Sequence, residues 1–112
     1  MLSEAAQRWG APPPPVVKDG RRWVYAFVDD LSGQVKIGRS ANPCRRYRAI
    51  SAHCPNDLRV LALLEVQDSW TAERCVHRAL VAGHSHSEWF HATDAQVLAA
   101  MECARFDDSG RL

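Results

Sequence analysis

The sequence predicts an α+β domain in which a small three-stranded antiparallel sheet is flanked by about three helices. Two alternating segments rich in β-branched and aromatic residues, 23–28 and 34–38, surround a turn. A more continuous apolar segment, 58–66, indicates a third and central strand that pairs with this hairpin. Three segments with helical periodicity follow capping residues. Together these features predict a hairpin, a third strand and helices packed on them.

The chain divides into an appendage, a domain and a tail. At 112 residues it has room for one domain, which we place at 21–106. In the appendage, 1–20, we expect a short helix at Ser3 to Trp9 before four prolines that favour a stiff polyproline II spacer. This segment is a candidate contact for a protein partner. Residues 107–112 are expected to fray.

The hairpin sets the register of the expected sheet. The Asp-Asp-Leu-Ser-Gly segment has the composition of a hairpin loop closing at Gly33. With this loop, Tyr25 lies opposite Gly38 and Phe27 opposite Lys36. Because side chains alternate between faces, Tyr25 and Lys36 share one face, with an open spot at Gly38 beside the tyrosine.

A helix is expected over 43–53. Asn42 is a good N-cap, and a proline occupies the first helical position, where its missing N–H costs nothing. At helical spacing, Arg46 falls at the edge of the apolar stripe, whereas Arg45 and Arg48 point away. The edge position favours a functional role for Arg46. The alternative is an aliphatic stem that only covers apolar surface.

Positive charge is concentrated locally. The whole chain is nearly balanced, with 14 Lys and Arg against 13 Asp and Glu, so its net charge does not indicate a nucleic-acid partner. Between positions 36 and 48, however, five basic residues and no acid occur: Lys36, Arg39, Arg45, Arg46 and Arg48. This segment predicts an anion-binding surface, with a solvated helix face as the alternative.

The next helix is expected over about 70–82, capped by Asp68 or Ser69 and ended by Gly83. Glu73 lies within its apolar stripe, and His77 lies one turn further along. The rest of this stripe is formed by Trp70, Val76 and Leu80. A carboxylate on a core-facing stripe is unfavourable unless it is paired or binds a metal. An ion pair with an arginine such as Arg46 is the structural alternative.

The remaining sequence predicts a polar loop at 84–87, a short edge segment at 88–91, and a last helix. Thr93 and Gln96 form a capping box for this helix. The four cysteines show no paired spacing and are expected to be reduced and partly buried. With no signal core and no apolar run of transmembrane length, the sequence predicts a cytoplasmic protein without a membrane partner. No feature indicates an oligomeric state.

Several short motifs occur in one order and at regular intervals. Trp23-Val24-Tyr25 precedes Lys36-Ile37-Gly38-Arg39-Ser40 by a step of 11 positions from Tyr25 to Lys36, and Arg46 follows 10 positions later. Glu73 lies on a helix, and Glu88-Trp89-Phe90 closes the series. Over roughly residues 22–101 this pattern resembles the GIY-YIG endonuclease superfamily, and within it a phage and bacterial branch with the same second and last motifs.

The resemblance implies a metal-dependent endonuclease that hydrolyses DNA phosphodiester bonds. Tyr25 would accept a proton from water, and Lys36 would lower the pKa of this phenol. Arg46 would hold the scissile phosphate, and Glu73 would bind one Mg²⁺ or Mn²⁺ ion. His77 would relay a proton or contact phosphate, although a core histidine bonded to a backbone carbonyl is equally compatible with the sequence.

DNA would contact Arg39, Ser40, Arg45 and Arg48. Many members of the superfamily also carry a late asparagine that steadies the metal-binding glutamate. This chain has no Asn after Asn56, and Glu88 or a histidine of 84–91 is a candidate replacement.

Two alternatives stay open. A non-catalytic DNA-binding module would retain the same fold and basic surface. A zinc site is the other, although no paired short spacing supports it. Its candidate ligands are His53, Cys54, Cys75, His77, His84, His86 and His91.

Overall fold

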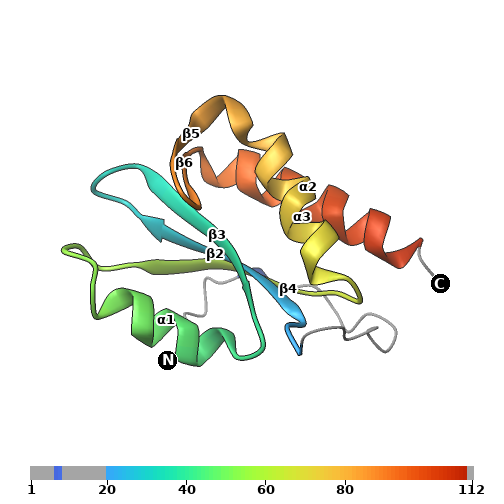
Figure 1. Ribbon diagram of the computed structural model, residues 1–112. Coiled ribbons are helices and arrows are strands. Elements are labelled where there is room, and N and C mark those ends of the chain that lie inside the picture. The colour runs from blue at the N-terminus through green and yellow to red at the C-terminus, as the bar shows by residue number, and fades with distance from the viewer. Residues whose placement is uncertain (1–6, 9–19, 111–112) are drawn as a thin grey trace.

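The computed structural model describes residues 7–8 and 20–110, and this part of the chain has the expected α+β fold (Figure 1). The prolines of the appendage lie outside the described residues. The strands are β1 (Gln7–Arg8), β2 (Trp23–Asp29), β3 (Gln34–Ser40), β4 (Arg59–Glu65), β5 (His84–His86) and β6 (Trp89–His91). The helices are α1 (Pro43–Ser51), α2 (Ser69–Ala79), the 3₁₀ turn η1 (Val81–Gly83) and α3 (Asp94–Ser109).

The sheet is larger than the sequence predicts. Within the described residues it has six strands rather than three, in the order β1-β4-β2-β3-β6-β5. β4 does pair with the hairpin, as expected. The segment 84–87, expected to be a loop, contains β5, which pairs with β6 and takes the edge position predicted for 88–91. Gln7 and Arg8 are extended and pair in parallel with β4, so the helix expected over Ser3 to Trp9 does not form at these two positions. The rest of that segment lies outside the described residues.

The predicted hairpin register is confirmed. Tyr25 pairs with Gly38, and Phe27 pairs with Lys36. The loop closes at Gly33, whose N–H donates to the Asp29 carbonyl at 2.9 Å. Gly33 adopts a φ of 72°, a left-handed conformation that glycine reaches without steric penalty. The loop chemistry therefore sets which side chains share a face.

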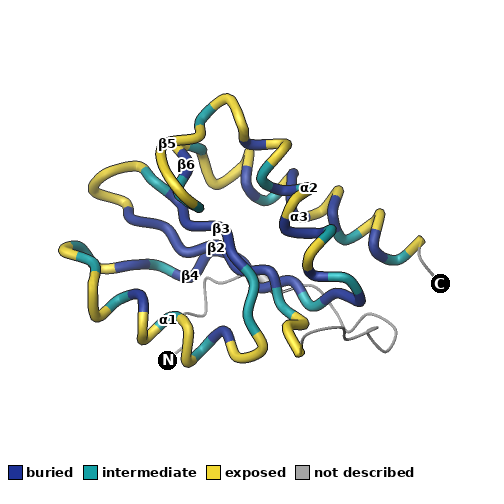
Figure 2. The backbone as a smooth tube through the Cα atoms, viewed as in Figure 1, coloured by how far each residue is buried: buried dark blue, intermediate teal, exposed yellow. Residues whose placement is uncertain are grey.

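Helices cover both faces of the sheet (Figure 1). α2 and α3 pack on one face, and the core between them and the sheet includes Val24, Ile37 and Met101. α1 lies on the other face. There, Ile50 of α1 packs in a smaller cluster with Tyr25 and Phe27 of the sheet. Figure 2 shows the central strands β2, β3 and β4 as a largely buried layer between these helices. Tyr25 thus belongs to the α1 face, and α2 approaches from the other.

The helix starts agree with the sequence better than the helix ends. Asn42 caps α1 by accepting from the Arg45 N–H at 3.0 Å, and the capping box at Thr93 is formed. α2 ends at Ala79, before Gly83, because η1 follows. α3 continues to Ser109, past the point where fraying was expected. Asp108 explains this: its buried carboxylate accepts from the N–H groups of residues 67 and 68 at 2.8 and 3.0 Å.

The four cysteines are free thiols, three of them half-buried and Cys103 exposed. Within the described residues, no helix combines the length and apolarity that crossing a bilayer requires.

Candidate functional site

A pocket of about 520 Å³ lies at the open end of the hairpin, where α2 approaches β3. β6 pairs with β3 only from Gln34 to Lys36, so the last residues of β3 extend beyond it. The pocket is lined by Arg21, Tyr25, Arg39, Ser40, Ala41, Arg46, Trp70, Glu73 and Glu88. It therefore gathers five of the site residues expected from the sequence: Tyr25, Arg39, Ser40, Arg46 and Glu73.

The phenol of Tyr25 is held tightly. Its side chain is 1% exposed, and its ring stacks on Phe27 with centroids 4.3 Å apart. A Cβ atom at Gly38 would collide with the Tyr25 hydroxyl. The sequence predicted an open spot at Gly38 beside the ring. The structure instead shows the Tyr25 phenol filling that space. The Arg46 Nε donates to the Tyr25 hydroxyl at 3.4 Å.

Charges around Tyr25 act in opposite directions. Burial is the largest influence and raises its pKa, and Glu88 and Glu73 raise it further. The hydrogen bond and the charge of Arg46 lower it. The cation adjoining the phenol is thus Arg46. Lys36, expected in this role, forms an ion pair with Glu88 at 3.2 Å, so its charge is engaged by a carboxylate.

Glu73 is a buried carboxylate, 8% exposed. Its pKa is raised, first by burial and then by Glu88, while His77, Arg39 and Arg21 lower it. Within the described part of the chain, Glu73 forms no hydrogen bond or ion pair. The ion pair with Arg46, which was the alternative to metal binding, is therefore not observed, and Arg46 donates to Tyr25 instead.

Trp70 does not join the apolar stripe of α2 as expected. It is 53% exposed at the pocket edge, whereas Val76 and Leu80 are buried. Trp70 lies in the first turn of α2, whose buried residues are instead Ser69 and Ala72.

The other predicted residues lie outside the pocket lining. His77 places Nε2 2.9 Å from the Ile37 carbonyl and therefore donates to it, which is the core role that the sequence left open. Arg45 and Arg48 are exposed on α1. Among the described residues, no three His, Cys, Asp or Glu side chains gather as metal ligands, so the zinc candidates do not form a cluster.

Sequence reasoning missed Arg21 and Trp70 as pocket residues and named Glu88 only as a replacement for an asparagine. Glu88 is positioned by a contact between distant segments, because the Ile37 N–H donates to its carbonyl at 3.0 Å. The tight turn before it includes Ser87 with φ 51°, a conformation that non-glycine residues seldom adopt. The Glu-Trp-Phe motif was the available signal for Glu88.

The donor set suits a hard divalent cation. Glu73 is buried without a partner among the described residues, and Glu88 lines the same pocket and shifts the pKa of Glu73 by its charge. Carboxylates together with water are the ligands that Mg²⁺ and Mn²⁺ prefer. A bound cation would compensate the charge of Glu73, whereas Glu88 already has Lys36 as a partner.

Fold and pocket together define a small α+β domain with an arginine-rich, carboxylate-containing pocket. The family model of the T5orf172 domain matches residues 22–105, and the chain belongs to this family. The domain is found in phage-type endonucleases and is associated with nuclease-like proteins. No curated protein and no solved structure matches the chain.

Proposed function

We propose that this chain is a metal-dependent endonuclease that hydrolyses DNA phosphodiester bonds in the pocket of Tyr25, Arg46 and Glu73. The proposal depends mainly on one observation, which is that these three side chains line a single pocket although they come from different elements. Tyr25 lies on β2, Arg46 on α1 and Glu73 on α2, and the two helices cover opposite faces of the sheet. The motif resemblance to GIY-YIG endonucleases and the T5orf172 match support the same chemistry.

Each residue has a distinct task in this proposal. The Arg46 guanidinium binds the scissile phosphate and stabilises the charge that develops on its oxygens. Tyr25 takes a proton from the attacking water. Because its pKa is raised, the phenol is protonated near neutral pH, and a proton-accepting role requires cleavage to accelerate as pH rises. A divalent cation held by Glu73, with Glu88 beside it, would supply Lewis-acid stabilisation of the phosphate.

The direct test is cleavage of supercoiled plasmid with Mg²⁺, Mn²⁺ or EDTA. We expect nicked or linear product with either metal and none with EDTA. Glu73→Gln should be inactive, whereas Glu102→Gln, which alters an exposed carboxylate on α3, should cut like the parent. Equal cleavage by Glu73→Gln, or cleavage in EDTA, contradicts the proposal.

A non-catalytic DNA-binding module is the second candidate. The pKa values of Tyr25 and Glu73 are both raised, which favours their protonated forms. A protonated phenol cannot take a proton from water, and a protonated carboxyl group is a poor metal ligand. For either function, affinity for duplex DNA should fall steeply with salt. Arg45→Ala should flatten that slope by about one unit if its guanidinium contacts a phosphate. Binding without cleavage under any metal favours the module.

A further inference from the structure

Trp70 is a large aromatic side chain that the fold does not bury. It is 53% exposed and belongs to neither core cluster of the described residues. It nevertheless lines the same pocket as Tyr25, Arg46 and Glu73. An exposed tryptophan at the edge of a polar pocket is a characteristic of sites that bind flat ligands, since its ring offers a large apolar face at low conformational cost.

Two arginines flank this ring. The Arg39 Cζ lies 5.0 Å from the Trp70 ring centroid, and the Arg74 Cζ lies 5.5 Å from it. Arg39 comes from the end of β3, and Arg74 lies one helical turn beyond Trp70. An aromatic face between guanidinium groups matches a nucleotide, because the ring stacks on the base while the cations contact the adjoining phosphates.

We propose that Trp70 is a stacking platform for an unpaired nucleobase next to the phosphate held by Arg46. The inference rests on the proposed nuclease function and specifies its substrate as DNA with at least one unpaired nucleotide at the cut. A base inside an intact duplex has both faces stacked on its neighbours and offers none to Trp70. A base stacked on an aromatic ring contributes more than an exposed cation–π contact, so it can displace a guanidinium from the ring.

Binding in EDTA tests the platform without requiring cleavage. The two probes are a labelled single strand of about 12 nucleotides and a duplex of the same sequence. A small single-strand-binding domain contacts a strand of about this length. Trp70→Ala should weaken single-strand binding about 5- to 100-fold and leave duplex binding within about twofold. Trp70→Phe retains a ring and should stay close to the parent. The matched control is Phe106→Ala, which removes an aromatic side chain of α3. Phe106 is 78% exposed and does not line the pocket.

A second probe locates the base. In a series of single strands, each nucleotide in turn is replaced by an abasic one. The parent should lose affinity at one position, and Trp70→Ala should show no further loss there. Equal effects of Trp70→Ala on single strand and duplex, or no sensitive abasic position, would overturn the platform. If the parent cuts plasmid and Trp70→Ala binds the single strand as tightly as the parent does, only the stacking inference fails. If the parent neither binds nor cuts DNA, the nuclease proposal fails as well.

Discussion

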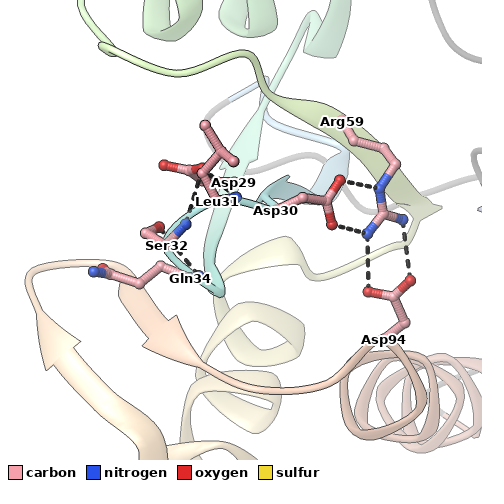
Figure 3. A network of polar contacts seen from close by, with 7 residues as sticks. All are labelled: Asp29, Asp30, Leu31, Ser32, Gln34, Arg59 and Asp94. Atoms are coloured by element: carbon pink, nitrogen blue, oxygen red, sulfur yellow. Dashed lines mark hydrogen bonds and ion pairs between the residues drawn. The ribbon is translucent and has the colours of Figure 1, made fainter.

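The two ends of the β2–β3 hairpin both carry clusters of charged side chains, and the clusters are built in opposite ways. At the loop end, Arg59 donates to the carboxylates of Asp30 and Asp94 through four hydrogen bonds of 2.8 to 3.1 Å (Figure 3). Beside it, the Asp29 carboxylate accepts from the Asn56 side chain and from backbone N–H groups of the loop. Every carboxylate of this cluster has a donor.

The pocket end is different. There Glu73 is buried with no hydrogen-bond partner among the described residues, and Glu88 adds a second negative charge. The pKa shifts follow the difference. Hydrogen bonds from Arg59 lower the pKa of Asp30, and a hydrogen bond from Asn56 lowers that of Asp29. Burial raises the pKa of Glu73 and of Tyr25.

The comparison contrasts a structural cluster of paired charges with the pocket that we propose to be functional. Paired charges at the loop end tie together three segments: the hairpin loop, β4 and α3. At the pocket end, the buried Glu73 carboxylate has no hydrogen-bond partner among the described residues, whereas Glu88 is paired with Lys36. Burying a carboxylate without such a partner is unfavourable, and on the proposed function a bound cation would offset this cost. Groups with perturbed pKa values in a pocket are typical of functional sites, although ion-pair networks also shift pKa values. Substitutions at each end can test the distinction.

The largest expected effect is that of Glu73→Gln, which should abolish metal-dependent cleavage and yet raise stability. Because the pKa of Glu73 is raised in the folded state, the folded protein binds this proton more tightly than the unfolded chain. Stability therefore falls as pH rises through the interval between the unfolded and the folded pKa. The glutamine removes this loss and should raise the free energy of unfolding by about 0.5–2 kcal/mol near neutral pH.

Thermal melting of Glu73→Gln across a pH series, in EDTA, measures this effect. The gain over the parent should be largest near neutral pH and disappear at acidic pH, where Glu73 is protonated in both states. With Mg²⁺ the parent should gain stability and the variant should not. A destabilised Glu73→Gln would show that the carboxylate has a structural partner and would remove the contrast between the two ends.

Arg46→Ala should reduce cleavage about 10²- to 10³-fold, the usual loss for one group that stabilises developing charge. It also removes the hydrogen bond and the charge that lower the pKa of Tyr25, so the remaining activity should require a higher pH than that of the parent. Rates measured against pH test both effects. Arg45→Ala, one residue away on α1, is the matched control and should retain the pH profile of the parent. A similar loss in both variants would indicate general DNA binding.

At the loop end, Arg59→Ala should lower stability and leave cleavage unchanged. Because the pairs are partly exposed, we expect a loss of about 1–2 kcal/mol, the sum of two surface ion pairs with good geometry. The pKa of Asp30 is lowered, so this stabilisation is present above its unfolded pKa and is lost as pH falls through the folded pKa. Chemical denaturation at neutral and acidic pH should therefore show the difference between parent and variant shrinking in acid.

Local chemistry made much of this structure predictable. The loop composition set the hairpin register, and with it the face shared by Tyr25 and Lys36. Capping residues located the starts of α1 and α3. Helical periodicity placed Glu73 on a buried stripe. These features depend on residues close together in the sequence, where turn geometry and the helical repeat leave few alternatives.

Features that lack an apolar pattern, or that depend on distant contacts, were not predictable. β5 is exposed and polar, so no apolar alternation indicates a strand, although its partner β6 follows after a short turn. Apolar periodicity predicted burial for Trp70, but the first turn of α2 buries Ser69 and Ala72 instead, and Trp70 lies at the edge of the pocket. The charge partner of Lys36 was also missed, because Glu88 reaches it through the pairing of β3 with β6.

The smallest expected effect concerns Lys36, which acts on the site through Glu88. Lys36→Met leaves the Glu88 carboxylate without its ion pair, and the negative charge of Glu88 raises the pKa of both Tyr25 and Glu73. The pH profile of cleavage should therefore move upward, with a moderate loss of rate near neutral pH, and Lys36→Tyr should retain part of the activity.

The double variant Lys36→Met with Glu88→Gln separates this indirect route from a direct one. If Lys36 acts by neutralising Glu88, removing both charges should return the profile towards that of the parent, and Glu88→Gln alone should move it to lower pH. If the ammonium acts on the phenol itself, the double variant should keep the upward shift of Lys36→Met. Because the two substitutions share a contact, the non-additivity of their effects on the profile measures the interaction that links Lys36 to the pocket.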